Sequence, residues 1–198
     1  MRLARGDFSL CHYKGFLRET YHHAGLNPQI QAMCTMFLKG RPRKIIKKFY
    51  QHAISEIGHD LLALADLGSL GVDKESIVNS RPLASTIAYN AYPLYEIQFC
   101  NPLSYLGYLF HLEFMPTQGG SDYIKSLKKV GVPDSALTFL EEHRSVDEQH
   151  NTFMKSYLEE LIQNEKDLDD VIHATRNSCQ LHGRMIVESF QNGEKLYS

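Results

Sequence analysis

Two segments of the sequence place histidines and a carboxylate at the same spacing, His-x-x-x-acid-x-x-His. The three residues are His52, Glu56 and His59 in QHAISEIGHD (51–60), and His143, Asp147 and His150 in EHRSVDEQH (142–150). On an α-helix, positions i, i+4 and i+7 form one stripe. Imidazole and carboxylate ligands together suit iron or manganese better than a soft metal. Two such stripes facing each other, with one more carboxylate between them, would form a site for two metal ions.

Glu113 is the candidate for that further carboxylate. It lies in the apolar segment YLGYLFHLEFM, where His111 is almost the only other polar side chain. A carboxylate buried there would carry a large desolvation penalty unless it were paired or bound to a metal ion. Metal ligation is the favoured interpretation, and a salt bridge to a buried arginine or histidine is the alternative. His52 is interpreted either as a ligand or as a residue that only contacts one.

The composition predicts one cytoplasmic domain over residues 1–198. A chain of 198 residues with 43% hydrophobic content can form a substantial core. The net charge of −2 argues against nucleic acid or an anionic membrane as a partner. The four cysteines form no Cys-x-x-Cys pair, as is typical of free thiols in a reducing compartment. The N-terminus lacks the apolar region of a signal peptide, and no apolar run is long enough to span a bilayer.

Helical periodicity dominates the sequence and strand signals are scarce, which predicts an all-α protein. We expect helices at about 7–24 with Asp7 as N-cap, 27–39, 42–67, 73–79, from Pro82 onward, 101–113, 122–130, 133–163 and 167–190. Helix 42–67 would carry the whole first stripe. It also contains Gly58, which inside a helix costs about 1 kcal/mol relative to alanine. A close approach of another helix or of a substrate would explain that glycine, as would packing alone.

Three blocks of the sequence together resemble a known family. SEIGHDLLALADLGSLGVD is similar to a Glu-x-Gly-His-Asp segment, NPLSYLGYLFHLEFMPTQGG to a Gly-Tyr-x-x-x-x-Glu helix followed by two glycines, and FLEEHRSVDEQH to a His-x-x-x-Asp-x-x-His helix. The family is that of the iron-containing redox enzymes, within the heme-oxygenase-like dimetal oxidases and oxygenases. Its relatives include the chlamydial protein associating with death domains, thiaminase II and the pyrroloquinoline-quinone biosynthesis oxidase. The likeness runs from about Tyr50 to the C-terminus.

The resemblance implies a heme-oxygenase-like helical bundle of about seven core helices. It implies a biosynthetic oxidoreductase with two non-heme iron ions that activates O2, with manganese as an alternative metal and no heme. The implied ligands are His59, Glu113, His143, Asp147 and His150, with Glu56 from the first block. His52 stands where several dimetal members carry a carboxylate, so its role stays open. The implied substrate is a small amine, amino acid or fatty acid, changed by C–H cleavage, N-oxygenation or oxidative C–C scission. Family likeness also suggests a homodimer.

Two other interpretations remain open from the sequence. One is a ferritin-like di-iron bundle, in which Glu56/His59 and Asp147/His150 would be the Glu-x-x-His-type pairs and Glu19 and Glu113 the further carboxylates. His52 and His143 would then have no function. The other is a non-catalytic helical binding or interaction protein that retains the fold, with salt bridges or water filling the histidine stripes.

Overall fold

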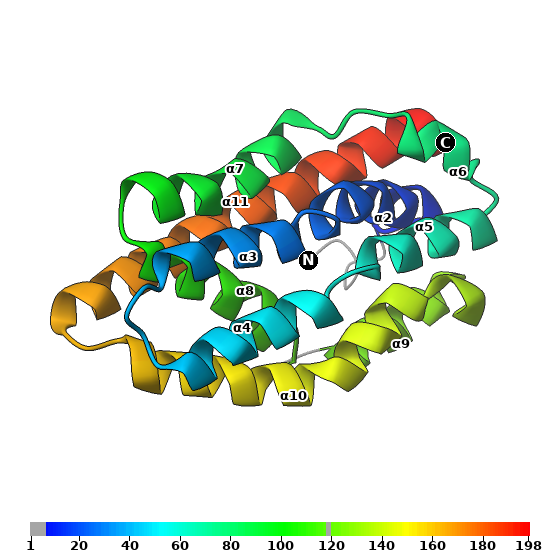
Figure 1. Cartoon of the computed structure of the whole chain (residues 1–198). Coiled ribbons are helices and arrows are strands. Elements are labelled where there is room, and N and C mark those ends of the chain that lie inside the picture. Colours follow the sequence, from blue (N-terminus) through cyan, green and yellow to red (C-terminus); the bar gives the residue numbers. More distant parts are fainter. Residues whose placement is uncertain (1–6, 118–119) are drawn as a thin grey trace.

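The fold consists of α-helices joined by short connections (Figure 1). The computed structural model describes residues 7–117 and 120–198, and it describes no side chain within 115–122 or 144–149. The α-helices are α2 (Leu10–Ala24), α3 (Asn27–Phe37), α4 (Arg43–Ser55), α5 (His59–Ser69), α6 (Lys74–Val78), α7 (Ala84–Phe99), α8 (Tyr105–Thr117), α9 (Gly120–Lys129), α10 (Thr138–Leu161) and α11 (Glu165–Tyr197). The short 3-10 helices η1 (Pro102–Ser104) and η2 (Asp134–Ala136) precede α8 and α10. No strand occurs in these described residues, so the expected all-α fold is confirmed.

The longest helix, α11, packs along α2, α7 and α8 on one side of the molecule, the upper side in Figure 1. On the opposite side, α10 packs against α4, α5 and α8. Helices α4 and α5 follow one another above α10 in this view. The two segments that carry the His-x-x-x-acid-x-x-His pattern are therefore neighbours in space, although about 90 residues separate them in the sequence.

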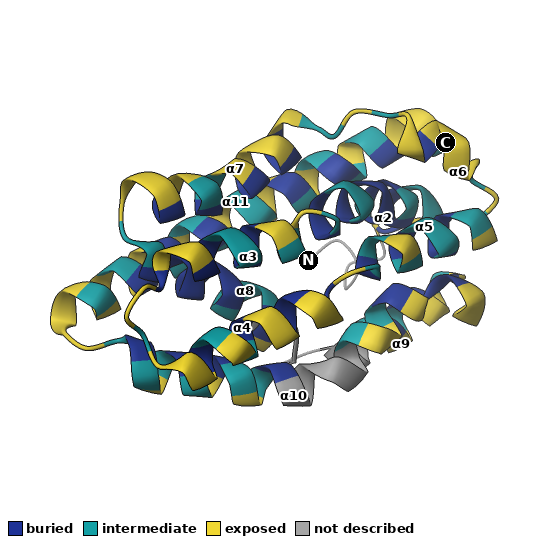
Figure 2. Ribbon diagram, viewed as in Figure 1, coloured by how far each residue is buried: buried dark blue, intermediate teal, exposed yellow. Residues whose placement is uncertain are grey.

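The buried apolar side chains form two clusters, and Figure 2 shows the buried faces turned inward. Phe49 of α4 and Tyr157 of α10 belong to one cluster. Leu67 of α5 and Phe139 of α10 belong to the other. The path from α4 to α5 and the path along α10 both cross from one cluster to the other. The histidine-rich segments lie at these crossings, so polar side chains are buried between two apolar cores.

The expected helix 42–67 is wrong in one respect, because it is two helices. α4 ends at Ser55 and α5 begins at His59. Between them Gly58 has a φ of +97°, a left-handed conformation that residues with a Cβ rarely adopt. A Cβ added at Gly58 would meet nothing within 4 Å. The glycine therefore serves to break the helix, and no close approach of another element explains it.

The first and last helices also differ from their expected ranges. The first helix begins at Leu10 rather than near Asp7, and the backbone N–H of Ser9 donates to Nδ1 of His12 at 2.9 Å. The last helix continues to Tyr197, beyond the expected end at 190, because it packs closely on α2. A Cβ at Gly15 would lie 2.1 Å from the carbonyl oxygen of Ser189, so only glycine permits this close contact. In the part of the chain that the structure describes, no helix has both the length and the apolar character that a membrane span requires.

Candidate metal centre

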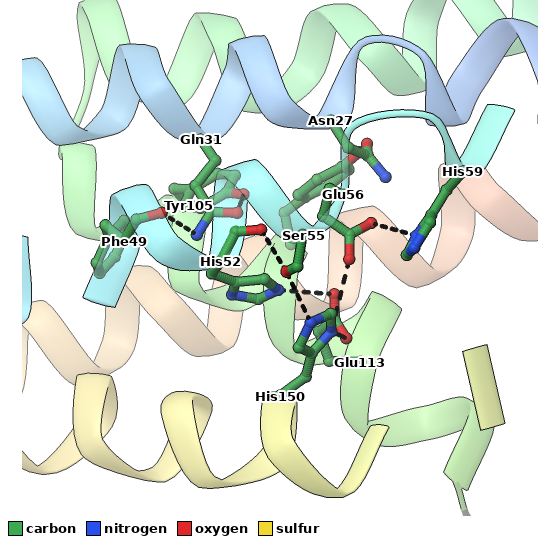
Figure 3. Close-up of polar contacts among 11 residues, drawn as sticks. Asn27, Gln31, Phe49, His52, Ser55, Glu56, His59, Tyr105, Glu113 and His150 are labelled. Carbon is green, nitrogen blue, oxygen red and sulfur yellow. Dashed lines mark hydrogen bonds and ion pairs between the residues drawn. The ribbon is translucent and has the colours of Figure 1, made fainter. Parts of the chain in front are cut away.

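Four buried side chains from three helices converge between the two apolar clusters (Figure 3). They are His52 of α4, Glu56 just after α4, Glu113 of α8 and His150 of α10, and they offer ligand atoms that all lie within 4.8 Å of one another. Nδ1 of His150 lies 2.8 Å from Oε2 of Glu113 and 3.6 Å from Oε1 of Glu56. Nε2 of His52 lies 3.4 Å from Oε1 of Glu113. This spacing is compatible with side chains that surround one small cation.

A second group adjoins the first and shares one residue with it. Glu56, His59 and His143 offer ligand atoms within 4.8 Å of one another. Oε2 of Glu56 lies 3.2 Å from Nδ1 of His59, while its Oε1 faces His150 of the first group. The rings of His59 and His143 lie 4.6 Å apart, centre to centre. One carboxylate therefore stands between two places that could each hold a metal ion.

The break after α4 creates this arrangement. Glu56 follows the last residue of α4, and His59 is the first residue of α5. The turn at Gly58 directs the two side chains toward each other, so the three residues of the first motif do not form the single helical stripe that we expected. Ile54 of α4 and Ile57 of the turn are exposed.

Asp66 caps the N-terminal end of α10, the helix that carries the second motif. Its carboxylate accepts hydrogen bonds from the backbone N–H and hydroxyl of Thr138, at 3.1 and 2.5 Å, and from the backbone N–H of Phe139, at 3.0 Å. The two backbone N–H groups belong to the first turn of α10, where a helix offers them no partner. Asp66 belongs to α5, so it joins the helix of His59 to the helix of His143.

His143 is oriented by its own helix. Its Nδ1–H donates to the carbonyl oxygen of Phe139, one turn earlier, at 2.8 Å. A neutral imidazole carries a single N–H, so Nε2 retains a lone pair. Histidines that bind metals in proteins commonly donate their other ring N–H to a backbone carbonyl in this way. The ring of Phe139 packs on His143 at 4.1 Å and limits its movement.

Glu113 of the first group stays ionised although it is buried. Burial alone would raise its pKa, but contacts with His150 and His52 lower that pKa to about 2. A buried carboxylate that stays ionised requires positive charge beside it. Oε1 of Glu56 and Nδ1 of His52 are buried and have no hydrogen-bond partner among the described residues. Carboxylate oxygens and imidazole nitrogens are the donors that iron or manganese takes, so these residues fit such an ion.

The structure brings together six of the seven predicted ligands. They are His52, Glu56, His59, Glu113, His143 and His150. The seventh, Asp147, lies in α10, and its side chain is outside those that the structure describes. Glu19 lies elsewhere, since its carboxylate accepts from the backbone N–H of Leu83 at 2.9 Å and from Thr86 at 2.5 Å, and pairs with Arg18. Glu19 therefore does not supply the further carboxylate of a ferritin-like site.

Sequence patterns missed two features near this centre. Ser55 lies beside His150, with its Oγ 3.2 Å from Nε2. His23 of α2 is buried, and its Nδ1 lies 2.6 Å from Oδ1 of Asn90. Neither residue belongs to a ligand motif. The sequence offers only the His22-His23 pair near the end of the first helix, which could reach a site or be exposed. Burial lowers the pKa of His23 to about 4, so this imidazole is neutral at pH 7.

The fold and the centre have a counterpart among solved structures. A crystal structure from Shewanella denitrificans OS217, described as a domain of unknown function with a heme oxygenase-like fold, superposes with a TM-score of 0.90. The two chains share 26% sequence identity over 100% of this chain and 85% of the other. The architecture is therefore that of the heme-oxygenase-like helical proteins.

The chain belongs to the family of iron-containing redox enzymes, whose sequence profile matches residues 14–183. This match confirms the resemblance inferred from the three sequence blocks. It also begins well before Tyr50, where the likeness had been expected to start. No curated protein of known annotation shows significant similarity to the chain.

Proposed function

We propose that this protein is a non-heme di-iron oxidase or oxygenase that uses O2 to oxidise a small organic substrate. The observation that carries the proposal is the position of Glu56, whose two oxygens face two adjacent groups of histidines and carboxylates. A carboxylate between two ions is a common way to hold a pair of metals a few ångströms apart. Membership of an iron-containing redox family supports iron in these positions.

Six converging side chains favour two metal ions over heme. Heme iron takes axial ligands from single residues on either face of a porphyrin. Here three imidazole-bearing helical segments and two carboxylates meet within a small buried volume. We therefore propose iron ions, with manganese as the alternative metal, because both accept mixed nitrogen and oxygen ligands.

Bound iron would supply the redox chemistry with O2, and the protein would supply position and environment. His52, Glu113 and His150 would hold the more buried ion, and His59 and His143 the other. The rings of Phe153 and Tyr157 lie 5.9 and 6.3 Å from that of His52 and keep this side of the centre apolar. His143 is only half-buried, so the second position lies nearer to solvent and is the side from which we expect substrate to approach.

The proposed substrates are small amines, amino acids or fatty acids, as in the family that the chain resembles. C–H cleavage, N-oxygenation and oxidative C–C scission are the corresponding reactions. An apolar wall beside the metal ligands suits the aliphatic part of any of these molecules. A substrate screen therefore begins with these three classes.

The direct test is an anaerobic Fe(II) titration of the metal-free protein followed by rapid mixing with O2. We expect about two iron ions per chain and a transient visible absorption that free Fe(II) does not produce. His143→Ala should bind less iron and lose the transient. Full iron content and an unchanged O2 reaction in that variant would contradict the assignment. Absence of iron uptake by the wild-type protein would instead favour a non-catalytic binding protein with this fold.

A further inference from the structure

Ser55 forms two contacts at the edge of the candidate metal centre. It is the last residue of α4 and is exposed, whereas His150 is only 3% exposed. Oγ of Ser55 lies 2.8 Å from the carbonyl oxygen of His52 and 3.2 Å from Nε2 of His150 (Figure 3). The serine thus links the backbone of one candidate ligand to the ring of another.

Counting protons determines the direction of both hydrogen bonds. A carbonyl oxygen can only accept, so the single hydroxyl proton of Ser55 is donated to His52, as serine often does within a helix. Oγ then has only lone pairs to offer to His150. Nε2 of His150 is therefore the N–H donor in this contact, and Nδ1 is the ring nitrogen left for a metal ion to bind.

Nδ1 of His150 faces the carboxylates of Glu113 and Glu56. Nδ1 lies 2.8 Å from Glu113 and 3.6 Å from Glu56. At 2.8 Å the contact with Glu113 is a hydrogen bond in which Nδ1–H donates to the carboxylate, and a metal ion that replaced this proton would lie among the same atoms. The arrangement suits a metal ion that binds Nδ1 and the carboxylates together.

We propose that Ser55 is a positioning residue that makes His150 a ligand through Nδ1. His143 lies two turns earlier in α10 and uses its Nδ1–H for the Phe139 carbonyl, so it presents Nε2. The two histidines of one motif therefore offer opposite ring nitrogens, each fixed by a different acceptor. This inference rests on the proposed metal site, but it does not depend on any reaction with O2.

The test uses Zn(II), which binds similar ligands and has no redox chemistry. Three variants are compared with the wild-type protein: Ser55→Ala, Ser55→Thr and Ser80→Ala. Threonine retains the hydroxyl. Ser80 is the matched control, because its Oγ lies 2.8 Å from the Ile77 carbonyl oxygen and 2.9 Å from Nε2 of His22, outside both candidate groups.

Two readouts are measured on the full chain: Zn(II) affinity by competition titration, and nitrogen NMR of imidazole-labelled protein, which shows the metal-bound and protonated nitrogens of each histidine. We expect Ser55→Ala to weaken the tighter Zn(II) site about tenfold. We also expect it to broaden or shift the His150 signals. Ser55→Thr should restore both, and Ser80→Ala should match wild type.

The outcomes separate the role of Ser55 from the proposed oxidase function. Zn(II) bound through Nε2 of His150, or a Ser55→Ala variant with wild-type affinity and spectrum, overturns the role of Ser55. Zn(II) bound through Nδ1 in a protein whose iron form ignores O2 supports Ser55 and overturns the proposed oxidase function. A wild-type protein that binds no Zn(II) and no Fe(II) overturns both.

Discussion

Glu113 and His150 lie 37 residues apart in the sequence, and their side chains meet at 2.8 Å in the interior. The pair joins α8 to α10, and both residues are less than 7% exposed. A carboxylate that is ionised in such a place requires a positive partner, which a metal ion or an imidazolium can supply. The first prediction concerns this pair.

Glu113→Gln keeps the volume of the side chain and removes its charge. We expect the tighter metal site to weaken by two or more orders of magnitude, since ligand loss costs more than the roughly 10–100-fold cost of losing a supporting contact. Wild-type protein should gain about 3 kcal/mol of stability at a metal concentration near 100 times Kd, and the variant should not. Calorimetric titration and thermal melting with and without chelator measure both effects.

Glu96→Gln is the control for this substitution. Glu96 is a buried carboxylate of α7 that belongs to neither group of candidate ligands. We expect the Glu96→Gln variant to bind metal with wild-type affinity. Equal affinities in Glu113→Gln and wild type would remove Glu113 from the ligand set.

Gly58→Ala tests the helix break. Alanine at a φ of +97° is strained, and we expect a loss of about 1–2 kcal/mol in the free energy of unfolding. Metal affinity should fall as well, because the turn directs Glu56 and His59 toward each other. Gly183→Ala is the matched control: Gly183 lies within α11, where a Cβ would meet nothing within 4 Å, and alanine should stabilise that helix by up to about 1 kcal/mol. Urea unfolding distinguishes the two, and equal effects would contradict the role assigned to Gly58.

Asp66→Ala tests the link between α5 and α10. Removing the acceptor leaves two backbone N–H groups and one hydroxyl without their partner. We expect a loss of about 1–3 kcal/mol in stability, together with weaker metal binding at the position near His143. Asp73→Ala removes the cap of the short helix α6, where Asp73 accepts from Glu75 and Ser76, and should lower stability without changing metal affinity. Wild-type affinity in Asp66→Ala would show that this bond does not position His143.

The pH dependence of the free energy of unfolding should show a contribution from His23. Burial lowers its pKa in the folded protein to about 4, whereas an exposed histidine titrates near 6.5. The unfolded chain therefore takes up this proton first, so stability is complete above pH 6.5 and is lost as the pH falls toward 4. The full contribution is on the order of 3 kcal/mol. Urea unfolding of metal-free protein between pH 7 and pH 5 should show a shallower decline for His23→Gln than for wild type, and parallel curves would contradict the prediction.

Much of the helical map could be predicted from local sequence. Helical periodicity located α6, and the Asn-Pro signals placed the beginnings of α3 and α8 within a few residues. Family-like spacing also singled out the histidines and carboxylates of both motifs. These features depend on residues close together in the chain, where composition and periodicity carry the information.

Other features depended on contacts between distant segments. Gly58 looks the same in a sequence whether it is tolerated within a helix or breaks one, and only the packing of α4 and α5 over α10 decided for the break. The side chains that meet at Glu56 likewise come from separate helices, and Ser55 acquires its partner across the interface with α10. The sequence by itself determined which residues could bind metal and that they lie on helices, because side-chain chemistry and helical periodicity are local properties. Tertiary structure alone decided that these residues form two adjoining groups around one carboxylate, because such convergence arises only when the helices pack.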